Sequence, residues 1–233
     1  MKLGIMQPYF FPYIGYYQLI NAVDKYIILD DVNFIKGGWI NRNRILIHKE
    51  PKYLNLPLKG GSRNRHINEL EVSSDMSLYK KNLKDLFINY RKAPYYEEVY
   101  PLLEEIMLYE ESNLAKWLEN SIRKVCDYLE INTPILVSSD INKNCELKCQ
   151  DKVIDMCKIM KADEYINAIG GQKLYSKEDF MSEGIKLNFL HTNEIVYNQF
   201  SDHMIAPNLS MIDVMMFNSK EDIKKMLEAY TLV

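Results

Sequence analysis

The chain opens with the short apolar run Leu3-Gly4-Ile5-Met6, which leads directly into Gln7-Pro8 and the aromatic loop Tyr9-Phe10-Phe11-Pro12-Tyr13. A continuous apolar run of this length is typical of a strand buried within a parallel sheet. Ligands of such sheets bind beyond the carboxyl ends of the strands, so we expect Gln7 at a ligand-binding edge. Residues 16–22 then predict a helix whose first backbone N–H groups can face an anion.

The same order of strand, polar exit and helix recurs along the chain. Further strands are predicted at residues 26–29, 134–137, 164–168 and 185–190, and the apolar spacing of residues 149–160 predicts a buried helix face. Strands that alternate with helices of this length indicate a parallel sheet with right-handed crossovers. The predicted fold class is therefore α/β, a parallel sheet with flanking helices whose strand exits share one edge.

The middle of the chain has a different pattern. Residues 77–129 carry apolar stripes at helical spacing, interrupted at Ala93-Pro94 because the residue before proline is disfavoured in a helix. We expect a single α/β domain over residues 1–233, with a mainly helical insertion at about 77–129. The tyrosine-rich passage at residues 90–96 suits either packing within a helical hairpin or the rim of a ligand site.

Composition and charge exclude several classes of protein. The 233 residues include 29 basic and 32 acidic side chains, a formal net charge of −3, which gives no strong attraction to nucleic acid or to a membrane surface. No apolar run approaches the length of about 18 residues that a membrane-spanning helix needs. Because a strand is predicted almost from the first residue, we expect no signal peptide and a cytoplasmic protein. The four cysteines lack the spacing of a zinc site, so no metal is predicted.

A basic segment at residues 36–44 follows the second predicted strand. Its glycines permit close backbone approach, its basic side chains suit phosphate or carboxylate, and its tryptophan offers a flat face to a base or sugar. The alternative is a solvated hairpin turn with Arg42 and Arg44 directed outward. The candidate substrate-binding or nucleotide-binding residues of this segment are Lys36, Trp39, Asn41 and Arg42.

Two further glycine pairs can supply backbone N–H groups to an anion. Lys59 or Arg63 can complete an anion-binding turn around Gly60-Gly61, although a solvated surface loop has the same composition. Gly170-Gly171 follow the strand at residues 164–168 and are expected at the ligand-binding edge.

The paired carboxylates Asp30-Asp31 follow the strand at residues 26–29. Adjacent parallel strands lie about 4.8 Å apart, so these carboxylates are expected close to Gln7 at one edge of the cleft. One of them is a candidate general base, with Gln7 orienting the reacting carbonyl; adjacent residues of an extended segment point to opposite sides, so one is expected to face the cleft. The alternative is a helix cap or an ion pair. His191, at a later strand exit, suits a structural or a catalytic role equally.

Several stretches form a long, ordered set that spans essentially the whole chain: residues 4–16, 29–34, 39–44, 90–95 and 209–213, together with Phe217-Asn218. Together they resemble the WbqC-like protein family. The resemblance implies an association with bacterial gene clusters for O-antigen and other surface polysaccharides.

The start of the first helix bears a more distant likeness. Tyr13-Ile14-Gly15-Tyr16 resembles the layout of nucleotidyltransferases and pantothenate synthetases, in which a His-x-Gly-His signature contacts ATP phosphates. By this analogy Tyr13 and Tyr16 are candidate nucleotide-binding residues and ATP is the candidate cofactor. Tyrosine is neutral and a poor proton donor near pH 7, so adenylation by the usual arrangement is not supported.

We therefore expect an enzyme of bacterial surface polysaccharide biosynthesis that forms an amide by acyl or aminoacyl transfer to a nucleotide-linked amino sugar. Such a reaction needs a base, donors for the developing oxyanion and a clamp for the diphosphate. A non-catalytic protein that binds sugar-nucleotides or assembles a biosynthetic complex fits the same basic loops. An RNA-binding or tRNA-dependent role requires a wide basic surface, which the net charge does not favour.

Overall fold

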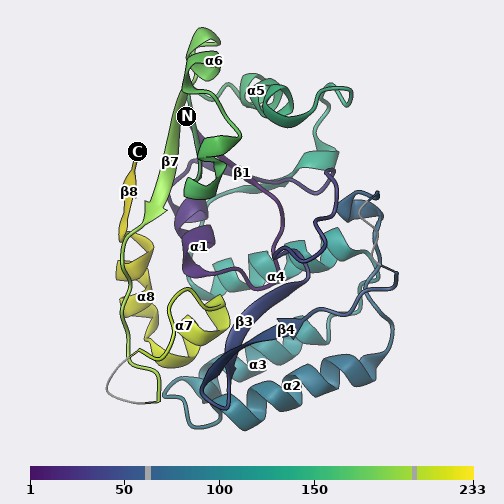
Figure 1. The fold of residues 1–233 in the computed structure, drawn as a ribbon, viewed down its shortest axis with the longest axis vertical. Coiled ribbons are helices and arrows are strands. Elements are labelled where there is room, and N and C mark those ends of the chain that lie inside the picture. The colour runs from purple at the N-terminus through teal and green to yellow at the C-terminus, as the bar shows by residue number, and fades with distance from the viewer. Residues whose placement is uncertain (61–63, 201–203) are drawn as a thin grey trace.

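A computed structural model describes residues 1–60, 64–200 and 204–233, and within these residues six strands form the main sheet in the order β5-β2-β1-β6-β7-β8 (Figure 1). All neighbouring strands are parallel except β8, which runs antiparallel to β7. The predicted α/β fold with a largely parallel sheet is confirmed. The strands are β1 (Lys2–Met6), β2 (Lys25–Ile28), β5 (Ile135–Val137), β6 (Glu164–Ala168), β7 (Lys186–Thr192) and β8 (Tyr230–Leu232).

The strand order reverses once across the sheet. The chain passes from β1 through β2 to β5 at one edge, then returns to the other side of β1 to form β6 and β7. Ligands of open parallel sheets bind at such a reversal, which here lies between the carboxyl ends of β1 and β6. The connecting helices are α1 (Ile14–Asn21) after β1, α4 (Leu114–Tyr128) before β5, α5 (Cys149–Met160) between β5 and β6, and α6 (Lys177–Ser182) between β6 and β7.

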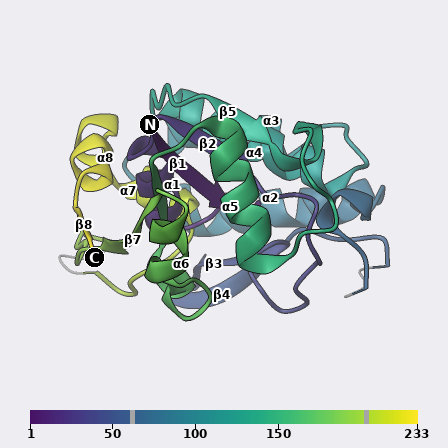
Figure 2. The same cartoon turned by 90° about the horizontal axis from the view of Figure 1, so that it is seen from above.

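Both faces of the sheet are covered, which explains the continuous apolar strands. Leu3 and Ile5 on β1 pack on the face that α5 and α6 cover, whereas Tyr26 and Ile28 on β2 pack on the face of α1 and α4. The C-terminal helices α7 (Met211–Phe217) and α8 (Lys220–Leu227) lie together at one end of the molecule when it is seen from above (Figure 2). Side chains two residues apart on a strand share a face, so each strand contributes to both cores.

The segment between β2 and β5 is large and occupies the lower half of Figure 1. Three helices, α2, α3 and α4, occupy residues predicted to be helical. That this segment forms an insertion in a single domain stays a prediction. An antiparallel hairpin of β3 and β4 precedes the helices. It begins within the basic segment at residues 36–44, for which a hairpin turn was the alternative to a ligand-binding loop. The new elements are β3 (Arg42–Ile47), β4 (Glu50–Asn55), α2 (Met76–Tyr90), α3 (Tyr96–Met107) and the short 3-10 helices Ile67–Glu69, Ser138–Asp140 and Ile169–Lys173.

A buried carboxylate joins the hairpin to the C-terminal helices. Asp213 of α7 is fully buried and accepts hydrogen bonds from the hydroxyls of Tyr90 (2.8 Å) and Tyr197 (2.7 Å) and from the Gln199 amide. The Tyr90 hydroxyl also accepts a bond from the backbone N–H of Leu46 on β3 at 2.8 Å. Burial raises the pKa of Asp213 above its ordinary value although the three donors lower it. A buried polar group requires such partners, so this network fixes α2, α7 and β3 relative to one another.

A second polar cluster joins the exits of β2 and β5. The Asp31 carboxylate contacts the ammonium groups of Lys143 at 2.8 Å and Lys152 at 2.9 Å and accepts a bond from the Ser138 hydroxyl at 2.6 Å. Burial raises the pKa of Asp31, but the bonds from Lys143, Ser138 and Lys152 outweigh it and lower the pKa to about 2. The neighbouring Asp30 accepts bonds from the backbone N–H (2.9 Å) and hydroxyl (2.6 Å) of Ser139.

Replacing Asp31→Asn should lower the stability of the protein in a pH-dependent way. Because the pKa of Asp31 is lower in the folded chain than in the unfolded chain, its charge stabilises the fold above about pH 4, and this stabilisation is lost as the pH falls toward 2. The stability difference between the two proteins should narrow by about 1 kcal/mol between pH 6 and pH 3. Urea unfolding over this range measures it.

The control is Glu71→Gln, which removes an ion pair with Lys59 at the surface. Exposed pairs contribute little, so this variant should follow the wild type. If the stability difference between wild type and Asp31→Asn stays constant from pH 6 to pH 3, the pKa of Asp31 is not lowered in the folded protein.

Candidate functional site

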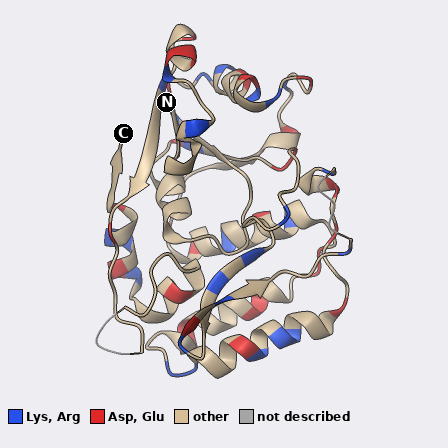
Figure 3. Ribbon diagram, viewed as in Figure 1, with Lys and Arg blue, Asp and Glu red and all other residues tan. Residues whose placement is uncertain are grey.

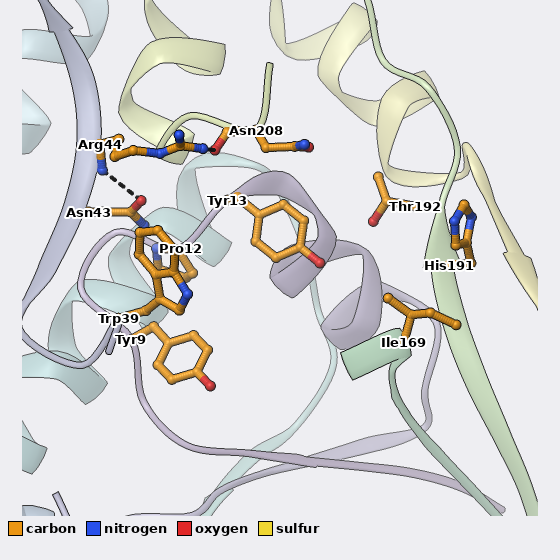
Figure 4. A pocket seen from close by; sticks show the side chains of 10 residues that line it. All are labelled: Tyr9, Pro12, Tyr13, Trp39, Asn43, Arg44, Ile169, His191, Thr192 and Asn208. Atoms are coloured by element: carbon orange, nitrogen blue, oxygen red, sulfur yellow. Dashed lines mark hydrogen bonds between the residues drawn. The ribbon is translucent and has the colours of Figure 1, made fainter. Parts of the chain in front are cut away.

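A cavity of about 360 Å³ lies at the reversal of the strand order (Figure 4). Its walls come from the loop after β1, the start of β3, the exits of β6 and β7, and the loop before α7. Segments that are far apart in the sequence thus meet where an open parallel sheet binds its ligands. The residues that line it are Tyr9, Pro12, Tyr13, Trp39, Asn43, Arg44, Ile169, His191, Thr192 and Asn208.

Buried hydrogen bonds to β3 fix the aromatic wall of this cavity. The Asn43 amide donates to the carbonyls of Phe10 at 3.2 Å and Phe11 at 2.8 Å. The backbone N–H of Phe10 donates to the Trp39 carbonyl at 3.0 Å, so the tryptophan loop is held against the loop after β1. Trp39 is 41% exposed. It offers a flat ring face to a ligand on a wall that is already rigid.

Arg44 provides the cationic wall. One terminal nitrogen of its guanidinium donates to the Asn208 carbonyl at 3.3 Å, while Nε is buried and has no hydrogen-bond partner within the described residues. A guanidinium carries five N–H donors, and a buried donor without an acceptor costs on the order of 1–3 kcal/mol. Because Nε has no exposed surface, a phosphate or carboxylate oxygen of a ligand in the cavity would be bound by the terminal nitrogens of the guanidinium.

The opposite wall carries hydroxyl groups and an imidazole (Figure 4). A Cβ atom placed on Gly15 would lie 2.4 Å from the Tyr13 hydroxyl and 2.5 Å from the Thr192 hydroxyl. The two hydroxyls therefore approach the first turn of α1 only because residue 15 is glycine. The Thr192 hydroxyl is buried without a partner in the described part of the chain, and His191 beside it on β7 is exposed.

Part of the predicted site lies at this cavity. Tyr13 and Trp39 line it, and Gly170 and Gly171 follow Ile169, which also lines it. Gln7 is half-buried in the loop after β1, and its backbone carbonyl accepts a hydrogen bond from the Tyr16 hydroxyl at 3.0 Å. Burial raises the pKa of Tyr16 far above its ordinary value, so this residue is a fixed neutral donor in the core.

The predicted basic residues bind their own chain. Arg42 donates to the carbonyls of Gly37 and Gly38, and its guanidinium lies 4.3 Å from the centre of the Tyr53 ring. Lys59 forms an exposed ion pair with Glu71 at 2.9 Å.

The remaining predicted residues lie apart from the cavity. The Asn41 amide donates to the Leu56 carbonyl at 3.3 Å, and Lys36 is exposed. Asp30 and Asp31 belong to the cluster between β2 and β5. Gly61 and Arg63 lie outside the described residues.

Sequence reasoning missed Arg44, Asn43, Thr192 and Asn208 as members of one site. Arg44 and Asn43 were inside the basic segment, but nothing local distinguished Arg44 from Arg42. His191 had a usable signal, its position at a predicted strand exit, and the structure places it in the cavity wall.

Over residues 1–60, 64–200 and 204–233, no group of three or more metal-binding side chains is placed to hold a metal ion. In the same residues no helix is long and apolar enough to cross a membrane.

Comparison with known proteins gives two matches. The model of the WbqC-like protein family matches residues 7–225. The chain is also similar to the uncharacterized protein Rv1507c of Mycobacterium tuberculosis, with 26% identity over 222 residues that cover 92% of each chain. No solved structure matches. Because the family model spans nearly all of the sequence, the chain belongs to the WbqC-like protein family.

Proposed function

We propose that the chain is an enzyme of bacterial surface polysaccharide biosynthesis that binds a nucleotide-linked amino sugar and transfers an acyl or aminoacyl group to its amine. The observation that carries this proposal is the cavity at the strand reversal, which the cationic side chain of Arg44 and the imidazole of His191 both line. The polysaccharide context comes from the family resemblance, and a cytoplasmic location belongs to the same proposal.

The walls of the cavity suit the parts of such a ligand. Arg44 binds a phosphate group through charge-assisted hydrogen bonds, and Trp39 packs against the sugar or the base. A volume of about 360 Å³ is within the range of small-molecule sites. Basic and acidic residues are interspersed in the view of Figure 3, which supports a small-molecule ligand over nucleic acid.

His191 takes the role of general base in this proposal. The sugar amine attacks the acyl carbonyl carbon, a C–N bond forms, the bond to the leaving group breaks with its electron pair, and His191 accepts the proton from nitrogen. The hydroxyl of Tyr13, which lines the cavity, can donate to the developing oxyanion. Asp31, the earlier candidate, is a poor base because its pKa is about 2. ATP stays the candidate cofactor for activation of the acyl donor.

Arg44→Ala should weaken nucleotide-sugar binding about tenfold or more, because the variant loses a charge-assisted hydrogen bond to phosphate. A thermal-shift screen of nucleotides and nucleotide-sugars selects the ligand, and titration calorimetry then measures its dissociation constant. Arg42→Ala is the matched control on the same strand and should change the constant less than threefold, because Arg42 binds its own loop. If Arg42→Ala weakens binding and Arg44→Ala does not, the cavity assignment is wrong.

His191→Gln should reduce turnover by about a hundredfold or more while the dissociation constant of the nucleotide-sugar stays within threefold. Amide formation on the selected sugar is followed by mass spectrometry. His48→Gln, in the exposed turn between β3 and β4, is the control and should keep full activity. Full activity of His191→Gln would remove the residue from the reaction. An intact ligand site with no turnover for any acyl donor would favour the non-catalytic alternative.

A further inference from the structure

A second cavity, of about 450 Å³, lies at the same edge of the sheet, between the exit of β2 and the start of α5. It is separate from the first cavity, since the two share no lining residue. Its chemically active lining residues are Asp31, His66, Cys145, Lys148, Cys149 and Lys152.

Positive charge exceeds negative charge in this wall. Lys152 lines the cavity and Lys143 does not, but the two side chains are only 10% and 1% exposed and both contact the single carboxylate of Asp31. The Asp31 carboxylate is already bonded to these two lysines and to the Ser138 hydroxyl. The adjacent Asp30 is turned to Ser139 and Asn68, so within the described residues it forms no ion pair with either lysine.

Lys148 adds a second ammonium group to the lining of the cavity. It is exposed and forms no ion pair with any residue that the structure describes. The acidic residues nearest in sequence, Glu146 and Asp151, do not line the cavity. The lining therefore carries two lysines, Lys148 and Lys152, and one carboxylate, that of Asp31, which the buried ammonium group of Lys143 also contacts. A concave wall with this excess of positive charge attracts anions.

We propose that this second cavity binds an oxyanion, the phosphate or carboxylate group of a small molecule. Its role as the site of the acyl donor rests on the proposed function, because transfer to a sugar amine requires a second substrate. The binding of an oxyanion does not depend on that role. Lys148 and Lys152 contact the anion, and Asp31 holds Lys152 in place.

Two cysteines in the wall allow occupancy to be measured without any activity. Cys145 and Cys149 are exposed and line the cavity, whereas Cys126 and Cys157 are buried, and burial raises the pKa of both of these thiols to about 12. Alkylation by iodoacetamide, quantified by mass spectrometry at each cysteine, therefore reports on the cavity. Pyrophosphate or citrate at millimolar concentration should slow alkylation of Cys149 severalfold. Free glutathione in the same solutions corrects for effects on the reagent.

The two anions show which group the cavity binds, because pyrophosphate carries phosphate groups and citrate carries carboxylate groups. Lys148→Glu should abolish the protection. Lys161→Glu carries the same charge change at the other end of α5 and should retain it. The proposal is overturned if neither anion protects the wild type, or if protection is equal in the two variants.

The same assay separates this proposal from the proposed function. Arg44→Ala alters the first cavity and should leave the protection of Cys149 unchanged. If the anions protect Cys149 but no nucleotide-sugar binds, the proposed function is wrong and the oxyanion site stands. If a nucleotide-sugar binds but neither anion protects Cys149, the oxyanion site is wrong and the proposed function stands.

Discussion

The pairing of β1 with both β2 and β6 is the constraint on which the site depends. Leu3 and Gly4 of β1 are each paired to a residue on either neighbour, and the strand is buried on both faces of the sheet. Because all three strands are parallel, their carboxyl ends open at one edge, and the loop after β1 crosses the point at which the strand order reverses. The order of the strands therefore produces a crevice at this point, whichever side chains line it.

The hairpin and the C-terminal helices turn this crevice into a chemically specific cavity. Asn43 donates to the loop carbonyls from β3, and the Ser210 hydroxyl donates to the Phe11 carbonyl at 2.7 Å from the start of α7. The Asp213 network then locks β3 to α7. Arg44 is thereby held at the sheet edge by buried hydrogen bonds, which are costly to break in a low-dielectric interior. The segment between β2 and β5 therefore places Arg44 in the wall of the crevice.

Much of the fold followed from local pattern. The five parallel strands and helix α5 were predictable because buried strands and amphipathic helices have different apolar periods. The hairpin at residues 42–55 was harder, because Leu54 is the only buried residue of β4 and the strand lacks a clear apolar face. The site was harder still. Asp31 is bound by Lys152, 121 residues away, and Arg44 by Asn208, 164 residues away, and no local pattern reports such partners.

The central claim is that the cavity at the strand reversal is the ligand site. The most direct measurement is a crystal structure of the protein with the nucleotide-sugar that binds most tightly in the thermal-shift screen. The account predicts a phosphate group within hydrogen-bonding distance of the terminal guanidinium nitrogens of Arg44 and the sugar or base against the Trp39 ring. Density for the ligand elsewhere, with the cavity between Arg44 and His191 filled only by water, would contradict it.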